Sequence, residues 1–145
     1  MSNLPPKLQE IVDDFAGMTR EEKLETLIAY AESFPPLPER YKKLRDDMES
    51  VPECMTPVFL IAEKDSDDKI AFHFDIPPES PTVRGYAAIL GEGLHGIPPE
   101  QVVSIPTDFY LQMGLHKVLS QQRLRGITAL LAYLKRLARE KLANS

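Results

Sequence analysis

The residue of this chain best suited to covalent chemistry is its single cysteine, Cys54. A cysteine thiolate is a strong nucleophile, and one thiol is enough to attack a sulfur–sulfur bond and carry the transferred sulfur. A lone cysteine is nevertheless more often a small buried apolar residue. Cys54 lies between Pro52 and Pro57, just before an apolar run at residues 58–62, so it is predicted on a loop tip, where reactive groups concentrate. A reactive thiol and an inert one both remain open on chemistry alone.

The charges that would surround this thiol act in opposite directions. The adjacent carboxylate of Glu53 disfavours a second negative charge and therefore disfavours the thiolate. The best candidate for a balancing cation is Arg123, which shares a face with Ile127 near the start of the last predicted helix. A guanidinium on that core-facing side should be paired or hydrogen-bonded, and a purely structural salt bridge is the alternative. Arg125 is about 200° further round the helix and is expected to be solvated.

Other motifs do not carry the chemistry that they suggest. Residues 91–96 match the dinucleotide pattern GxGxxG, but a predicted helix precedes them and two prolines follow, where the motif needs a strand and then a helix. The aspartates at residues 65–68 fail as a calcium loop because Ile70 and Ile76 hold the positions of its glycine and glutamate. One cysteine cannot supply a multi-thiolate zinc or iron–sulfur site. We expect no metal and no cofactor on this chain.

Composition indicates one ordinary globular domain, residues 1–145, with a formal net charge of −5. The negative charge argues against nucleic-acid binding, and no apolar run reaches the roughly 18 residues that span a bilayer. The N-terminus lacks the pattern of a signal peptide, so we expect a cytoplasmic protein without a membrane partner. The C-terminal part, from Lys117 on, is basic. This is explained either by helix-dipole complementarity with a solvated face or by a surface that docks a partner.

The periodicity of apolar residues predicts helices, then a hairpin, then helices. Residues 5–16 form a short amphipathic helix, and a capping box of Thr19 and Glu22 opens a second one. Residues 39–50 remain open between a helical turn and a loop. Strands are expected at residues 58–62 and 70–76, joined by a turn at 65–68. The predicted core face of the second helix consists of four apolar side chains, Leu24, Leu27, Ile28 and Ala31.

Three further helices follow the hairpin. Ser80 is expected to cap the first, which gives way to a loop at residues 91–99. Thr107 is expected to cap a short helix, and Ser120 to cap the last, longest one. The last helix carries an apolar stripe of Ile127, Leu130, Leu131, Leu134 and Leu137. The fold class is therefore α+β: a small antiparallel β-sheet, a hairpin with room for one more short strand, packed against N-terminal and C-terminal helices.

Taken together, these segments resemble the SufE family of cysteine desulfuration proteins. Residues 51–58 read Val-Pro-Glu-Cys-Met-Thr-Pro-Val, similar to the family's reactive loop, and residues 83–85 read Val-Arg-Gly where the family has Val-Lys-Gly. Residues 119–126, Leu-Ser-Gln-Gln-Arg-Leu-Arg-Gly, resemble its final motif, and residues 21–23 its Glu-Glu-Lys helix. The chain departs from the pattern at Glu53, where glycine is common, at Thr56 for serine and at Gln121 for proline.

The resemblance implies a SufE/IscU-like fold and a role in iron–sulfur cluster assembly. Cys54 would take persulfide sulfur from a cysteine desulfurase, stimulate that enzyme and relay the sulfur to an iron–sulfur scaffold complex. Pyridoxal phosphate is expected only on the desulfurase. Glu53, Thr56, Arg84 and Arg123 would support Cys54 or bind the partner, and Cys54 would rest in an apolar pocket and swing out on docking.

Two alternatives to a sulfur acceptor remain. The first is a non-catalytic interaction domain with an inert Cys54. The second is a thiol peroxidase or redox sensor, which would normally need a resolving cysteine, and the chain has only one cysteine.

Overall fold

The structure, a computed structural model, describes residues 4–34, 37–42, 48–51, 58–77 and 79–143. The predicted α+β class is confirmed, because helices precede and follow a small antiparallel sheet. In chain order the elements are α1 (Pro6–Ala16), α2 (Arg20–Glu32), α3 (Glu39–Lys42), β1 (Glu49–Ser50), β2 (Phe59–Lys64), β3 (Ile70–Asp75), α4 (Pro81–Gly93), α5 (Pro99–Val103), α6 (Tyr110–Met113), a 3₁₀ turn (Leu115–Lys117) and α7 (Gln121–Ala143).

The sheet has the order β1-β2-β3, with both pairs antiparallel, so the predicted hairpin gains one short strand. Ile70, Phe72 and Phe74 of β3 are buried, whereas the residues between them are only partly buried, as strand alternation requires. In the turn, Asp65 Oδ1 accepts the backbone N–H groups of Asp67 and Lys69, each at 2.9 Å. The aspartates therefore shape a solvated hairpin turn, as expected.

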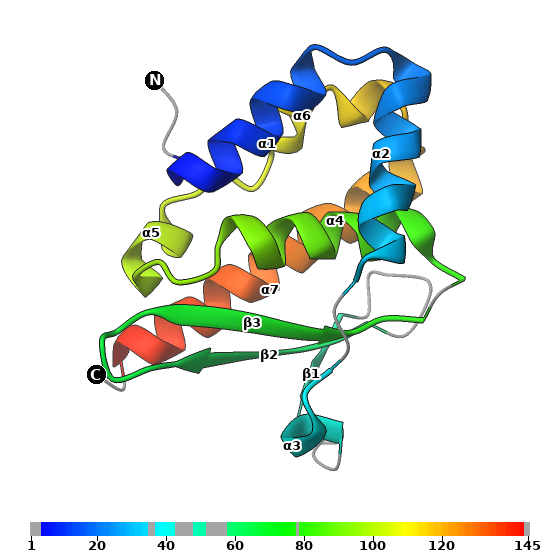
Figure 1. Ribbon diagram of the computed structural model, residues 1–145. Coiled ribbons are helices and arrows are strands. Elements are labelled where there is room, and N and C mark those ends of the chain that lie inside the picture. The colour runs from blue at the N-terminus through cyan, green and yellow to red at the C-terminus, as the bar shows by residue number, and fades with distance from the viewer. Residues whose placement is uncertain (1–3, 35–36, 43–47, 52–57, 78, 144–145) are drawn as a thin grey trace.

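The helices form layers on the sheet (Figure 1). α4 lies between the sheet and the N-terminal pair α1 and α2, and α7 runs behind α4 and also contacts β2. α3 lies on the opposite, outer side of the sheet. One cluster of buried apolar side chains joins the sheet to α1, α2, α4 and α7, and it includes the whole predicted stripe of α7. The burial of that stripe fixes α7 against the rest of the protein.

Of the four N-cap residues predicted from the sequence, two cap their helices in the structure. The capping box is present, with Thr19 N–H to Glu22 Oε1 at 2.8 Å and Glu22 N–H to Thr19 Oγ1 at 3.2 Å. Ser120 Oγ accepts the N–H of Arg123 at 3.3 Å and so caps α7. Ser80 stands at the N-cap position of α4, but its fully buried side chain makes no capping hydrogen bond. Thr107 does not cap α6, because that helix begins at Tyr110, after a turn.

Two further expectations need correction. On α2 only half of the predicted core face is buried: Leu24 is 39% and Ile28 36% exposed. Lys23 is buried instead, because its Nζ donates to the Met18 carbonyl at 2.8 Å. The loop expected at residues 91–99 is shorter and comprises residues 94–98, since α4 continues to Gly93 and α5 begins at Pro99.

Candidate functional site

The segment that carries Cys54, Glu53 and Thr56 lies outside the described residues, but both of its ends are described. Val51 and Val58 are almost completely buried, and the Val51 N–H donates to the Val58 carbonyl at 3.1 Å. This bond extends the pairing of β1 with β2, in which Ser50 lies opposite Phe59. The sheet therefore anchors the chain on either side of residues 52–57.

Arg84, near the start of α4, links three elements through its side chain. Its Nε donates to the Ala31 carbonyl at 3.2 Å, in the last turn of α2, and its Nη1 donates to the Ile76 carbonyl just after β3. The guanidinium also lies over the Phe34 ring, 4.5 Å from its centroid. These contacts use the planar, forked geometry of arginine, which a lysine cannot reproduce.

Arg123 lies in the first turn of α7, where Ser120 caps its backbone N–H. Its side chain is partly buried and that of Arg125 is exposed, which agrees with the helix angle between them. Within the described part of the chain, the Arg123 guanidinium makes no hydrogen bond or ion pair. The expected pairing is thus not seen there. Arg84 and Arg123 come from α4 and α7, two helices that pack on each other.

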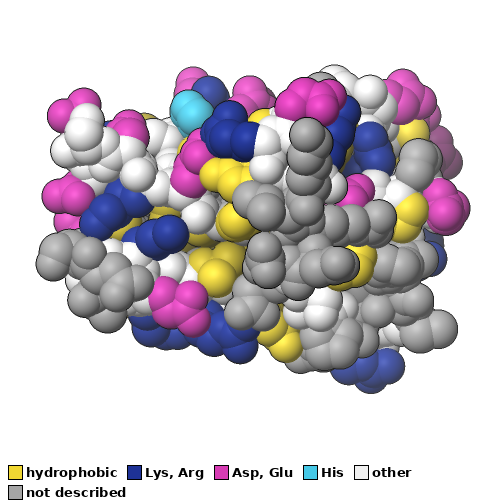
Figure 2. Space-filling view, turned by 90° about the horizontal axis from the view of Figure 1, so that it is seen from below, with side chains coloured by type: hydrophobic (Ala, Val, Ile, Leu, Met, Phe, Trp, Pro, Cys, Tyr) yellow, Lys and Arg dark blue, Asp and Glu magenta, His cyan; other side chains and the backbone are white. Residues whose placement is uncertain are grey.

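Some of the basic residues of the C-terminal part have internal contacts. Lys135 Nζ donates to the Ile105 carbonyl at 2.6 Å, and burial lowers the pKa of this lysine. Arg136 lies over the Tyr133 ring at 4.7 Å. On the face shown in Figure 2, lysine and arginine side chains lie among acidic ones, and neither sign dominates the described surface. For Lys135 and Arg136 these contacts favour a role in packing, and the two explanations of the other basic residues both remain.

A polar cluster that was not predicted from the sequence lies on the outer face of the sheet. Glu63 of β2 accepts a hydrogen bond from Tyr41 Oη at 2.5 Å, forms an ion pair with Arg40 at 2.6 Å and lies 3.0 Å from His73 Nε2. The Tyr41 hydrogen bond, followed by those of His73 and Arg40, lowers the pKa of Glu63 to about 2. Hairpin alternation could have placed Glu63 and His73 on one face, but nothing in the sequence indicates Arg40 and Tyr41 beside them. The cluster holds α3 on the sheet.

Among the described residues, no group of three or more histidine, cysteine, aspartate or glutamate side chains could hold a metal ion. In the same part of the chain, no helix combines the length and the apolar character needed to cross a membrane. The fold and the site together define a small α+β protein with one cysteine on the segment that leads into its hairpin.

Comparison with known proteins places this architecture in a family. The model of the SufE family, described as an Fe-S metabolism associated domain, matches residues 9–138. A SufE-like protein of Mycobacterium tuberculosis is 40% identical over 139 residues, which cover 96% of each chain. The cysteine desulfuration protein SufE of Plasmodium vivax is 26% identical over 129 residues, 86% of this chain and 49% of that protein. The solution structure of a hypothetical protein from Thermus thermophilus matches with a TM-score of 0.84 and 36% identity, covering 97% and 98% of the two chains.

The chain therefore belongs to the SufE family, whose domain is associated with Fe–S metabolism. The resemblance found in the short motifs at residues 51–58, 83–85 and 119–126 is thereby confirmed at the level of the family.

Proposed function

We propose that this protein is the sulfur acceptor of a cysteine desulfurase and that Cys54 carries the sulfur. The partner is a pyridoxal-phosphate enzyme that holds sulfur as a persulfide on its own cysteine. This protein stimulates that enzyme and delivers the sulfur to an iron–sulfur scaffold complex. Family membership is the observation that carries the proposal. The relative in Plasmodium vivax, which is named a cysteine desulfuration protein, supports it.

The transfer step needs no outside oxidant or reductant. The Cys54 thiolate attacks the outer sulfur of the desulfurase persulfide, and a new sulfur–sulfur bond forms on Cys54. The bond between the two desulfurase sulfurs breaks, and its electron pair leaves with the desulfurase cysteine as a thiolate. One thiol suffices on the acceptor side, which agrees with the single cysteine of the chain.

The described frame around residues 52–57 supports this role. Cys54 is the third residue after Val51, and three residue steps of chain reach at most roughly 10 Å. Because the Val51–Val58 hydrogen bond ties both ends of the segment to the sheet, the thiol is presented from a rigid base. A fixed base suits a group that must meet the persulfide of another protein.

We assign supporting roles to four residues. Arg84 fixes the start of α4 through its two carbonyl contacts, and Arg123, partly exposed on α7 and unpaired among the described residues, favours the thiolate or binds the desulfurase. Thr56 keeps the hydroxyl that serine supplies in the family pattern. Glu53 opposes formation of the thiolate, so it serves recognition of a particular desulfurase.

The deciding experiment follows the sulfur itself. The protein is incubated with a cysteine desulfurase and cysteine, and its intact mass is measured without reductant. The wild type should gain one sulfur atom that reductant removes, and Cys54→Ser should gain none. Absence of any gain with several desulfurases would overturn the proposal. It would favour the second candidate, an interaction domain in which Cys54 is inert.

Two further proposals concern the whole chain. Residues 1–145 form one SufE-like domain, which the single buried cluster from α1 to α7 supports. The protein acts in the cytoplasm. Fractionation of cells that express the full-length protein tests this localisation.

A further inference from the structure

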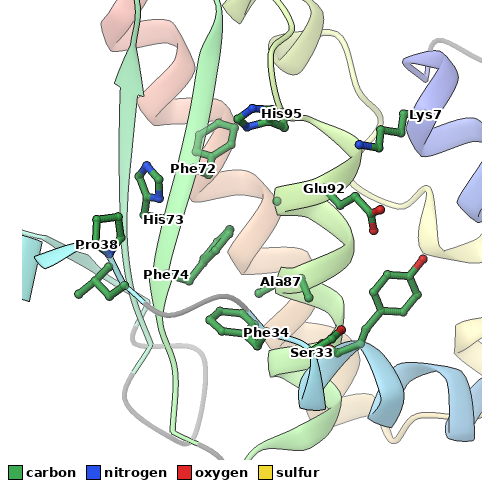
Figure 3. Close-up of a pocket in the computed structure, with 14 residues that line it drawn as sticks. Lys7, Ser33, Phe34, Pro38, Phe72, His73, Phe74, Ala87, Glu92 and His95 are labelled. Atoms are coloured by element: carbon green, nitrogen blue, oxygen red, sulfur yellow. The ribbon is translucent and has the colours of Figure 1, made fainter.

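A cavity of about 520 Å³ lies between β3, α4 and the end of α2 (Figure 3). Its volume is within the range of natural small-molecule sites, which is roughly 300–1,000 Å³. Among the described residues, its lining includes neither Arg84 nor Arg123, and neither Val51 nor Val58; it does include Phe34, whose ring lies under the Arg84 guanidinium. The Fe–S role of the family does not account for it.

The base of the cavity is apolar and has room for a side chain. Phe34 and Phe74 meet edge to face there, with ring centroids 6.2 Å apart, and Phe72 lies on the same strand as Phe74. The α4 side is lined by Ala87 and Gly91, whose minimal side chains leave the space open. A Cβ added to Gly91 would stand 3.5 Å from the Phe74 ring, so the glycine lets α4 pack closely on this ring.

Charged groups line the cavity on the side of α1 and α4. Lys7 and Glu92 lie on the same side in Figure 3, opposite His73. Within the described residues, neither side chain has a hydrogen-bond or ion-pair partner. Tyr30 also lines the cavity, and its pKa is raised by burial and then by the charge of Glu92, which indicates that the two side chains are near each other. One cation and one anion are thus available beside an apolar base.

The edge of β3 adds main-chain donors and acceptors. Ile70 uses its outward N–H and C=O to bond Ile97 and Gly96, each at 2.9 Å. Because strand residues alternate, Phe72 and Phe74 direct their N–H and C=O groups the same way, away from β2. In the described part of the chain these groups have no main-chain partner, and both residues line the cavity.

The cavity is also short. In Figure 3, His95 lies at one end and Phe34 at the other, so the open edge of β3 spans only a few residues between them. A long strand added to the sheet would not fit between these two ends. A compact ligand with backbone-like polar groups suits the site better.

We propose that this cavity binds a free α-amino acid with an apolar side chain. The ligand carboxylate pairs with Lys7, its ammonium pairs with Glu92, and its side chain occupies the space among Phe34, Phe72 and Phe74. Charge complementarity selects the zwitterion, and the phenylalanines select an apolar side chain over a polar one.

The test is an NMR titration of the full chain with leucine, methionine and phenylalanine in turn. Saturable shifts are expected at the amides of Phe72, Phe74 and Gly91. N-acetyl-leucine, which lacks the ammonium, and leucinamide, which lacks the carboxylate, should bind at least about tenfold more weakly, since each loses one charge-assisted contact. Absence of saturable binding by all three amino acids would overturn the proposal, and so would equal binding of leucine and the two derivatives.

Variants of Lys7 and Glu92 test the contribution of each charge to ligand binding. Lys7→Met and Glu92→Gln should each weaken leucine binding at least about tenfold. Their matched controls, Lys117→Met and Glu25→Gln, change exposed residues outside the cavity and should leave binding unchanged. Lys7→Met should also abolish the preference for leucine over leucinamide, which a merely structural effect would leave intact. An equal loss in the control variants, or an intact preference in Lys7→Met, would contradict the assignment of the charges.

Discussion

Gly85 of α4 lies directly against the backbone of Leu27 in α2: a Cβ on Gly85 would stand 2.2 Å from the Leu27 carbonyl oxygen. No real contact is this short, and the obstacle is backbone that cannot turn aside. The absence of a side chain at Gly85 thus sets how closely α2 and α4 approach each other. Because Arg84 precedes it, the same close approach brings the Arg84 side chain within reach of the Ala31 carbonyl.

Gly85→Ala should therefore destabilise the protein, and a second glycine of the same helix supplies the control. We expect Gly85→Ala to lower the free energy of unfolding by about 1–3 kcal/mol or more, because α4 must move away from α2. At Gly91 a Cβ meets only the Phe74 ring at 3.5 Å, an ordinary contact. Gly91→Ala should raise stability by about 0.5–1 kcal/mol through helix propensity. Equal denaturant midpoints for the two variants would refute this account.

Arg84→Lys should destabilise the protein although it keeps the positive charge. Lysine offers a compact ammonium in place of a fork that reaches the Ala31 and Ile76 carbonyls together. The loss of about one such hydrogen bond corresponds to roughly 0.5–1.5 kcal/mol in chemical denaturation. The exposed Arg125→Lys serves as the control and should change stability by less than about 0.5 kcal/mol. A similar small effect at both positions would mean that the Arg84 contacts do not stabilise the fold.

Glu63 should make stability depend on pH in the acid range. Its pKa, lowered to about 2 chiefly by the Tyr41 hydrogen bond, lies below the usual unfolded value of about 4.3. A carboxyl with a depressed folded pKa stabilises the protein fully above the unfolded pKa, and this stabilisation is lost as pH falls from about 4.5 towards 2. Glu63→Gln should flatten the pH dependence of the unfolding free energy in that window. A pKa near 4 for the Glu63 carboxyl in an NMR titration of the wild type would contradict the prediction.

Tyr86→Phe should stabilise the protein. Tyr86 is fully buried, and within the described residues its hydroxyl has no hydrogen-bond partner, which costs free energy. Removing the oxygen keeps the ring on Phe109, 5.8 Å away between centroids, and should raise the unfolding free energy by about 1 kcal/mol. Tyr41→Phe is the matched comparison and should act in the opposite sense, because it deletes the bond to Glu63. If thermal unfolding shifts both variants downward, the Tyr86 hydroxyl has a partner after all.

Arg123→Ala should impair stimulation of a cysteine desulfurase more than Arg125→Ala. The first side chain is partly buried beside the α7 cap, and the second points into solvent two residues later. Sulfide release by the desulfurase in the presence of each variant measures the effect, and circular dichroism checks that both variants fold. Equal losses would show that the helix face does not distinguish the two arginines.

The elements that could be predicted from the sequence are those whose pattern is local. Alternation at Ile70, Phe72 and Phe74 predicts a half-buried strand, and the structure confirms it. Ser120 and the apolar stripe of α7 were also predicted correctly, because a cap and a periodic face depend on residues within a few positions of each other. The difference in exposure between Arg123 and Arg125 follows from helix geometry in the same way.

Features that depend on distant segments were not predictable. Lys23 takes a buried position on α2 because it reaches the Met18 carbonyl and packs on Gly114, and apolar Leu24 and Ile28 are left half-exposed. The cavity behind β3 draws its lining from α1, α2, β3 and α4, and no single stretch of sequence signals it. For the segment around Cys54, the flanking prolines predicted a loop tip, and only the family motifs indicated a function, since a lone cysteine has no pattern.

The single bridge between Ile70 and Ile97 has a consequence for association between molecules. The bridge is antiparallel, so a ladder along β3 would have to continue through Gly96 and His95, which form a turn at the end of α4. Gly96 has a φ of 75°, so the added segment cannot continue along β3 as a ladder. The remaining edge at Phe72 and Phe74 lies within the cavity wall, below the surrounding surface. An exposed edge strand is a template for aggregation through sheet-to-sheet pairing. Here a turn and a recess together protect the edge from polymerisation while leaving it open to a small molecule.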